Sequence, residues 1–184
     1  MQQFARVQQG NAVMPALVSE AGLLDLRSLV SDITPETIAS GVLTKVNAAA
    51  LKPLGGDVRY LAPISGIRQI PATGFNYKKH IEEMKVPTPT EPEIFLKSMT
   101  SLTGPFDPIS RGPNRGVKLD WETELAIVVG REVLDITAEE AAGCILATFA
   151  STMFLIDQLR WMRRNSSTLC VQSLVRRIVR SGPI

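Results

Sequence analysis

The amino-acid sequence predicts an α+β protein built from short strands and short helices. Of its 184 residues, 45% are apolar and 21% are charged, which is enough apolar material to bury a core. The 13 glycines and 12 prolines divide the apolar segments into short pieces. No apolar run is long enough to span a bilayer, and the first residues lack the apolar stretch of a signal peptide. We therefore expect a soluble protein.

Cysteine usage indicates a reducing compartment. Cys144 and Cys170 are the only two cysteines, too few for a disulfide scaffold and too isolated for a zinc site. Together with the missing signal peptide, this pattern predicts a cytoplasmic location.

The first part of the chain, residues 1–62, is expected to form a small N-terminal module. A helix should begin at Pro35, because Thr34 can cap it and proline is tolerated in the first helical turn. Residues 25–30 before it are expected to form a short strand or turn. A connector rich in glycine and proline follows, with one short strand near residues 58–61.

Residues 63–150 are expected to form a second unit. Its clearest strand is residues 120–130, and Thr137 with Glu140 has the spacing of a helix capping box. The proline-rich stretch at residues 86–92 cannot continue a helix. The remaining expected elements are a strand within 67–77 that leads into a glycine turn, a helix over 78–84 and a strand over 94–97.

The last segment, residues 151–184, differs in charge from the rest. It holds six arginines against the single acid Asp157, whereas residues 1–150 hold 14 basic against 17 acidic residues. A basic tail can bind nucleic acid or a membrane surface. However, it has few aromatic residues for base stacking, so we expect neither nucleic acid nor membrane as a partner.

Two acidic residues of the strand 120–130 could share a function. Side chains alternate along a strand, so Glu122 and Glu124 should point to the same face. A divalent cation between them would remove their repulsion, and oxygen ligands suit Mg²⁺, Mn²⁺ or Ca²⁺. Two glutamates on the solvated face of a strand are also common, and this pair alone favours that simpler interpretation.

The only histidine, His80, lies in the expected helix 78–84. Glu83, three residues later, is on the same helical face and could accept a hydrogen bond from one imidazole nitrogen. The other nitrogen would then be able to take a proton from water. Taken alone, the pair favours the simpler interpretation of an exposed helix surface.

Four segments of the chain are informative when they are taken together and in order: GFNYKKHIEE at 74–83, FLK at 95–97, GPFDPI at 104–109 and DWETEL at 120–125. In this combination they closely resemble the fumarylacetoacetate hydrolase family. Residues 25–30 and the stretch Ile33-Thr34-Pro35 also look like the small N-terminal region of bacterial members, and the resemblance spans roughly residues 20–148. It implies that residues 63–150 are a partial catalytic domain of this family.

The resemblance implies a mixed β-roll fold, incomplete here at the C-terminal side, and a dimer. It implies Mg²⁺ or Mn²⁺ held by three carboxylates, two of which match Glu122 and Glu124. His80 and Glu83 match a catalytic dyad on a short helix, and Lys97 matches a basic residue near the site. The implied substrates are small 2-oxo or 1,3-dicarbonyl acids, and the reactions are C–C hydrolysis, isomerisation or decarboxylation.

The sequence departs from the family pattern after the helix that begins at Thr137. Met153 stands where the third carboxylate is expected, and no later segment matches the family's lysine-containing motif. In the neighbouring reading frame, compatible codons for residues 151–157 spell Asn-Asp-Val-Ser-Asp-Arg, the motif expected there. We hypothesise a frameshift shortly before residue 151, with the tail translated out of frame. The nucleotide sequence decides this hypothesis.

The sequence thus predicts an enzyme whose activity is impaired in this chain. The alternative is an inactive remnant or a non-catalytic subunit that pairs with a complete homologue.

Overall fold

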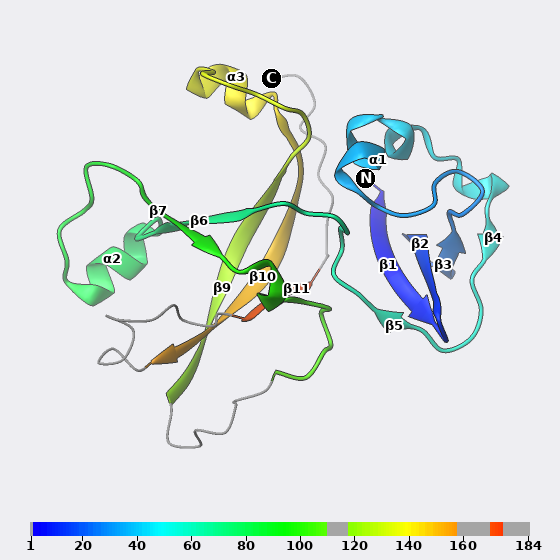
Figure 1. Ribbon diagram of the computed structural model, residues 1–184, viewed down its shortest axis with the longest axis horizontal. Coiled ribbons are helices and arrows are strands. Elements are labelled where there is room, and N and C mark those ends of the chain that lie inside the picture. The colour runs from blue at the N-terminus through cyan, green and yellow to red at the C-terminus, as the bar shows by residue number, and fades with distance from the viewer. Residues whose placement is uncertain (1, 110–117, 158–169, 175–184) are drawn as a thin grey trace.

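The computed structural model describes residues 2–109, 118–157 and 170–174, and its strands form three sheets (Figure 1). A five-stranded sheet has the order β4-β3-β2-β1-β5, and a four-stranded sheet has the order β8-β11-β10-β9. β6 and β7 form a separate antiparallel pair. The strands are β1 Gln3–Gln9, β2 Ala12–Ser19, β3 Gly22–Asp25, β4 Lys52–Pro53, β5 Arg59–Tyr60, β6 Ile70–Gly74, β7 Glu93–Lys97, β8 Leu102–Thr103, β9 Lys118–Val129, β10 Ile145–Asp157 and β11 Cys170–Leu174.

The three α-helices form where the sequence predicts them. The Thr37 amide donates to the Thr34 hydroxyl at 3.2 Å and thereby caps α1 (Pro35–Ala39). α2 occupies Lys78–Met84, and α3 (Ala138–Ala142) begins with the expected capping box. α1 and α3 thus begin at side-chain caps that the sequence displays, whereas the N-cap residue of α2 makes no side-chain capping hydrogen bond.

The long hairpin of β1 and β2 was not predicted from the sequence. The two strands pair antiparallel from Gln3 opposite Val18 to Gln9 opposite Ala12. Gly10 lies in the connecting turn with φ +58°, a conformation that glycine adopts without strain. A Gly-Asn pair between two apolar segments is a known hairpin signal, so this element was predictable.

The main core lies within the N-terminal region, defined here as residues 2–67. Leu26 and Ile33 are almost completely buried at its centre. Val128 of β9 and Leu146 of β10 also pack against this core, so the two parts of the chain share an apolar contact. The other buried members of the cluster are Phe4, Leu17, Ile38, Leu43, Val46 and Ile64.

A polar contact also joins the two parts of the chain. Arg59 of β5 pairs with Asp107 at 2.9 Å, and the ring of Tyr60 meets Phe106 edge-on. These contacts hold the segment after β8 against β5 and thus fix where the second sheet begins.

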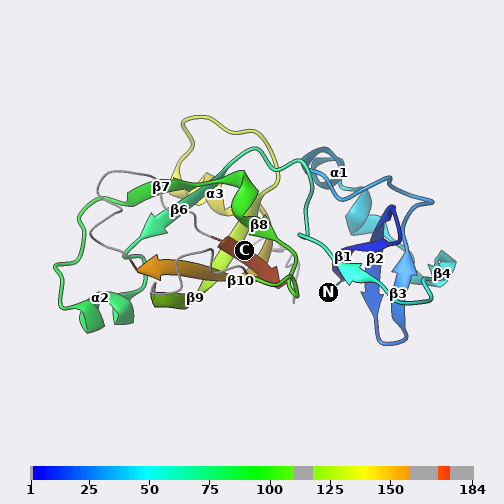
Figure 2. The same cartoon turned by 60° about the horizontal axis from the view of Figure 1, so that its bottom comes forward.

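The β6–β7 pair lies across one face of the β9–β10 sheet, as both ribbon views show (Figures 1 and 2). β9 and β10 pair antiparallel over nearly their whole length, and among the described strands β9 is the outer one. β10 runs from Ile145 to Asp157 and therefore crosses residue 151, where the basic tail was expected to begin. Most of that tail lies outside the described residues. This arrangement brings the end of β7 close to the middle of β9.

None of the helices in the described ranges is long and apolar enough to cross a membrane.

Candidate active site

β9 places Glu122 and Glu124 on the same face of the sheet. Along residues 121–130, even-numbered residues are partly buried, while odd-numbered residues are exposed. Trp121 and Leu125, on the odd face, are each 64% exposed. The two carboxylates therefore project toward the more enclosed side, the arrangement that a shared cation requires. Their role as metal ligands is not tested by this geometry and stays a prediction.

Lys97, at the end of β7, interacts electrostatically with both carboxylates. Burial of the Lys97 amine lowers its pKa from 10.5 to about 8, although the charges of Glu122 and Glu124 act in the opposite direction. The same amine lies 5.1 Å from the centre of the Phe95 ring. The resemblance expected a basic residue near the site, and the fold brings this lysine to the glutamate pair from a different strand.

His80 and Glu83 lie on α2, three residues apart, and both are exposed. The imidazole stacks on the Phe75 ring, with centroids 6.3 Å apart and ring planes 18° apart. In the part of the chain that the structure describes, no hydrogen bond joins His80 to Glu83. The dyad therefore remains a prediction, and what orients the imidazole here is the aromatic contact.

Phe75 holds this contact from an unusual backbone position. Its φ is +47°, in the left-handed region that residues other than glycine rarely adopt. The position follows Gly74, at the end of β6, where the chain turns toward α2. The turn thus directs the Phe75 ring back over the first turn of the helix.

Tyr77 links this turn to β9, and sequence reasoning missed its contribution. The Leu125 amide donates to the Tyr77 hydroxyl at 2.9 Å, and the Glu124 carboxylate lies close enough to affect the pKa of the same hydroxyl. Partial burial raises the pKa of the Tyr77 phenol; the Leu125 amide lowers it, and Glu124 raises it further. The contact spans 48 residues of sequence, so no local pattern could have revealed it.

The position directly across from Glu122 is Met153 of β10, and the position across from Glu124 is Ser151. A residue at 153 therefore lies beside the glutamate pair, where the resemblance places the third carboxylate. The sequence therefore departs from the family pattern at a position beside the candidate metal ligands.

The donor set fits a dication held by two carboxylates. Mg²⁺ is often bound through one or two carboxylates, with waters and substrate completing the shell. The described residues contain no cluster of three or more His, Cys, Asp or Glu side chains able to hold a metal. Glu122 and Glu124 thus supply suitable hard oxygen ligands, but fewer than a dedicated protein cage.

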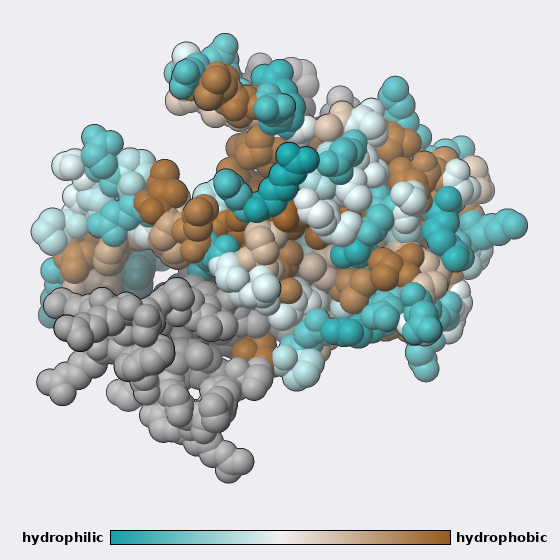
Figure 3. All heavy atoms as spheres, in the orientation of Figure 1, coloured by the Kyte–Doolittle hydropathy of each residue, from teal (hydrophilic) through white to brown (hydrophobic). Residues whose placement is uncertain are grey.

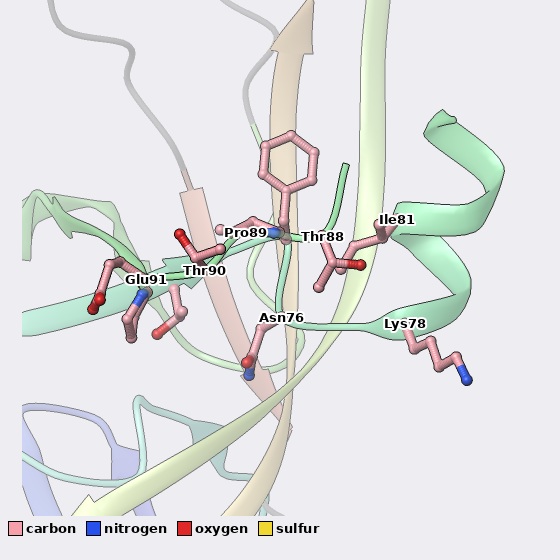
Figure 4. Close-up of a pocket in the computed structure, with 11 residues that line it drawn as sticks. Asn76, Lys78, Ile81, Thr88, Pro89, Thr90 and Glu91 are labelled. Carbon is pink, nitrogen blue, oxygen red and sulfur yellow. The ribbon is translucent and has the colours of Figure 1, made fainter. Parts of the chain in front are cut away.

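A hollow of about 490 Å³ opens beside α2 (Figure 4). It lies between the end of β6, the start of α2 and the proline-rich segment that the sequence excluded from the helix. The labelled polar groups of Asn76, Thr88, Thr90 and Glu91 come from two of these segments. Most of the lining is apolar, with these few polar groups, and the hollow lies next to the helix that carries His80.

Comparison with known proteins identifies the family. Residues 69–152 match the model of the fumarylacetoacetate (FAA) hydrolase C-terminal domain. This part of the chain belongs to the fumarylacetoacetate hydrolase family, as the resemblance predicted. The match begins just before β6 and ends within β10, so it contains Tyr77, His80, Glu83, Lys97 and the glutamate pair of β9.

Two curated relatives that this chain resembles are enzymes by name. It is 34% identical over 175 residues to a 2,4-didehydro-3-deoxy-L-rhamnonate hydrolase of Sphingomonas sp. (strain SKA58), covering 91% of this chain and 60% of that relative. It is 39% identical over 111 residues to the human mitochondrial oxaloacetate tautomerase FAHD2A, covering 59% of this chain and 34% of that protein. The chain thus spans less than two thirds of the length of either relative.

Solved structures share the α+β fold. A fumarylacetoacetate hydrolase from Exiguobacterium antarcticum superposes with a TM-score of 0.75 at 24% identity, covering 95% of this chain and 67% of that one. A maleylpyruvate hydrolase from Sphingobium sp. SYK-6, solved with manganese (II) ion and pyruvate, gives a TM-score of 0.71 at 20% identity, with coverages of 93% and 65%. At these identities the likeness establishes the fold, which agrees with the predicted fold class.

Proposed function

We propose that this chain is a metal-dependent enzyme that acts on small 2-oxo or 1,3-dicarbonyl acids and that its activity is impaired. The observation that carries the proposal is the pair of carboxylates on one face of β9, with Lys97 beside it and α2 tied to the same strand. The manganese and pyruvate bound by one structural neighbour support this choice of metal and substrate class. We assign Glu122 and Glu124 as the ligands of Mg²⁺ or Mn²⁺.

Each assigned residue has a chemical role in the proposed reaction. A dication bound at the glutamate pair would polarise the carbonyl of a 2-oxo acid. The Lys97 ammonium is placed to attract the acid's carboxylate. His80 takes a proton from water, and Glu83 stabilises the resulting imidazolium. The hollow beside α2 is lined by none of these residues, so it is not part of the proposed site.

The proposed impairment of activity follows from the residue type at position 153. A carboxylate across from Glu122 would complete a set of three, and methionine, whose thioether is a soft and weak ligand, does not supply it. Both a frameshift origin of the tail and assembly as a homodimer are part of this proposal. A cytoplasmic location likewise stays a prediction.

A second candidate function is a non-catalytic subunit that pairs with a complete homologue. The apolar side chains exposed on β9, together with the chain's coverage of 60% of its hydrolase relative, favour it. Co-purification with a full-length homologue would support this alternative.

The proposal is tested by measuring hydrolysis of an acylpyruvate by the full chain, with and without added Mn²⁺. We expect slow turnover that requires the metal and is lost in Glu122→Gln and in His80→Asn. Glu132→Gln, at an exposed position after β9, is the matched control and should keep the activity. Turnover that is indifferent to metal and to both site substitutions would contradict the proposal.

A further inference from the structure

The connection between β6 and α2 is anchored to β9 by a single hydroxyl. Tyr77 occupies the N-cap position of α2, but its side chain makes no capping hydrogen bond to the helix. It reaches β9 instead, where it accepts from the Leu125 amide at 2.9 Å and lies near the Glu124 carboxylate. The residue that starts the helix therefore contacts the strand that carries the candidate metal ligands.

A phenol hydroxyl is suited to this double contact because it both accepts and donates. β9 pairs with β10 on one side, and no described strand pairs with its other side. Backbone amides on an outer strand lack a partner from the sheet. By accepting from Leu125, the oxygen satisfies one such amide, and its proton remains available for the Glu124 carboxylate. A carboxylate bound by a fixed donor has fewer accessible orientations, and its other oxygen stays available.

The same hydroxyl also determines where His80 lies. His80 follows Tyr77 by three residues, within the first turn of α2. Phe75, two residues before Tyr77, stacks on the His80 ring. Figure 4 shows the chain leading from Asn76 into α2 next to β9. Displacement of the Tyr77 hydroxyl would therefore move both the helix and the imidazole relative to the glutamates.

We propose that Tyr77 is a positioning residue whose hydroxyl orients the Glu124 carboxylate and anchors the start of α2, with His80, on β9. The part that concerns Glu124 as a ligand rests on the proposed function, whereas the anchoring of α2 does not. Tyr77 would act through Glu124 and His80 and would not contact the reacting atoms.

The central experiment compares Tyr77→Phe with the wild-type full chain by two measurements. Hydrogen–deuterium exchange reports the Leu125 amide, and calorimetric titration with Mn²⁺ alone reports the affinity of the site. The substitution keeps the ring and removes the hydroxyl, together with its hydrogen bond to Leu125. Because the loss of a hydrogen bond changes an equilibrium by up to about tenfold, we expect about tenfold faster exchange at Leu125 and, if the hydroxyl orients Glu124, about tenfold weaker Mn²⁺ binding.

Two control variants separate positioning from a general loss of structure. Tyr60→Phe removes the hydroxyl of the only other tyrosine, which packs edge-on against Phe106 in a different part of the fold. Ile81→Val loosens the packing of the one buried residue of α2 and keeps the Tyr77 hydroxyl. Both controls should retain wild-type Mn²⁺ affinity and Leu125 protection.

The results separate this inference from the proposed function. Unchanged Leu125 exchange in Tyr77→Phe would overturn the anchoring, and an equal loss of Mn²⁺ affinity in Ile81→Val would overturn the specific role of the hydroxyl. If the wild-type chain binds no Mn²⁺, the proposed function fails, and the Glu124 part of the inference fails with it. Exchange at Leu125 then still decides the anchoring of α2.

Discussion

The N-terminal region and the site region, defined as residues 68–109 and 118–157, bury their apolar side chains to very different extents. In the first, Leu26 and Val7 are fully buried, and Val13 and Leu29 are its only large apolar side chains with high exposure. In the site region, Ile81 is the one large aliphatic side chain in the buried class among those described. Its exposed large apolar residues are Tyr77, Met84, Ile94, Phe95, Leu96, Phe106, Trp121, Leu125, Ile127, Val129, Val133, Leu134 and Ile136.

The strand that carries the candidate ligands therefore has one partly buried face and one exposed face. The glutamate pair is on the partly buried side of β9, while the odd-numbered residues of the same strand are exposed. Figure 3 shows apolar surface, in brown, over β7 and beside α3. Large exposed apolar areas are typical of interaction surfaces. The N-terminal region buries most of its large apolar side chains, whereas the site region leaves many of them exposed and available for contact.

The largest effect that tests this comparison is expected from shortening one leucine in each region. Leu26→Ala creates a cavity in the main core and should lower the free energy of unfolding by about 2–5 kcal/mol. Leu125→Ala removes a side chain that is 64% exposed and should change it by less than about 0.5 kcal/mol. Urea unfolding measures both. Equal losses would show that the exposed face of β9 is covered in solution.

A smaller effect is expected from the ion pair between Arg6 and Asp32, 2.6 Å apart in the N-terminal region. Burial raises the pKa of Asp32, but hydrogen bonds from Arg6, Ser65 and the Ile33 amide outweigh it, so the net direction is downward. Because Asp32 keeps some solvent contact, we expect Asp32→Asn to cost about 1–2 kcal/mol at neutral pH.

The lowered pKa of Asp32 also gives the sign of the pH dependence. The ionised carboxylate stabilises the fold above its ordinary pKa of 3.8, and this contribution is lost as the pH falls through the lower folded-state value. Urea unfolding at decreasing pH should therefore show the wild-type chain losing stability below about pH 4, and Asp32→Asn losing less. Asp25→Asn, which breaks an exposed pair with Arg27, is the control. Asp25→Asn keeps Asp32 and should lose stability in acid nearly as the wild type does, so an acid loss as small as that of Asp32→Asn would contradict the assignment to Asp32.

The third prediction concerns the site region alone. Met153→Asp places a carboxylate across from Glu122, and a third oxygen ligand should strengthen Mn²⁺ binding by about tenfold, equivalent to about 1.4 kcal/mol. Thr152→Asp, across from Thr123, adds the same charge one position away and should have a much smaller effect. Calorimetric titration compares them. Equal gains in the two variants would indicate nonspecific attraction to added charge.

Local features of this protein were predictable from the sequence, and long-range contacts were not. The three helices have caps or breakers that lie within a few residues, and the strand of β9 alternates visibly. The contact of Tyr77 with Leu125 depends on the packing of one sheet on another. The approach of Lys97 to the glutamates depends on the same packing, and the resemblance alone suggested it.

Two other features could not be, or were not, predicted for more specific reasons. The β1–β2 hairpin carried a local signal that was overlooked, the Gly-Asn turn. The hydrogen bond expected between His80 and Glu83 depends on side-chain orientation, and helical spacing only makes it possible. Here the Phe75 ring stacks on the imidazole and orients it. Phe75 has a positive φ, which the residue types of this segment do not predict.

The central claim, that Glu122 and Glu124 form a cation site on β9, is tested most directly by titrating the full chain with Mn²⁺. We predict saturable binding by the wild-type chain and its loss in the double variant Glu122→Gln/Glu124→Gln. A control double variant at two exposed positions, Glu132→Gln/Glu139→Gln, should bind as the wild type does. Equal Mn²⁺ affinity in all three proteins would contradict the claim.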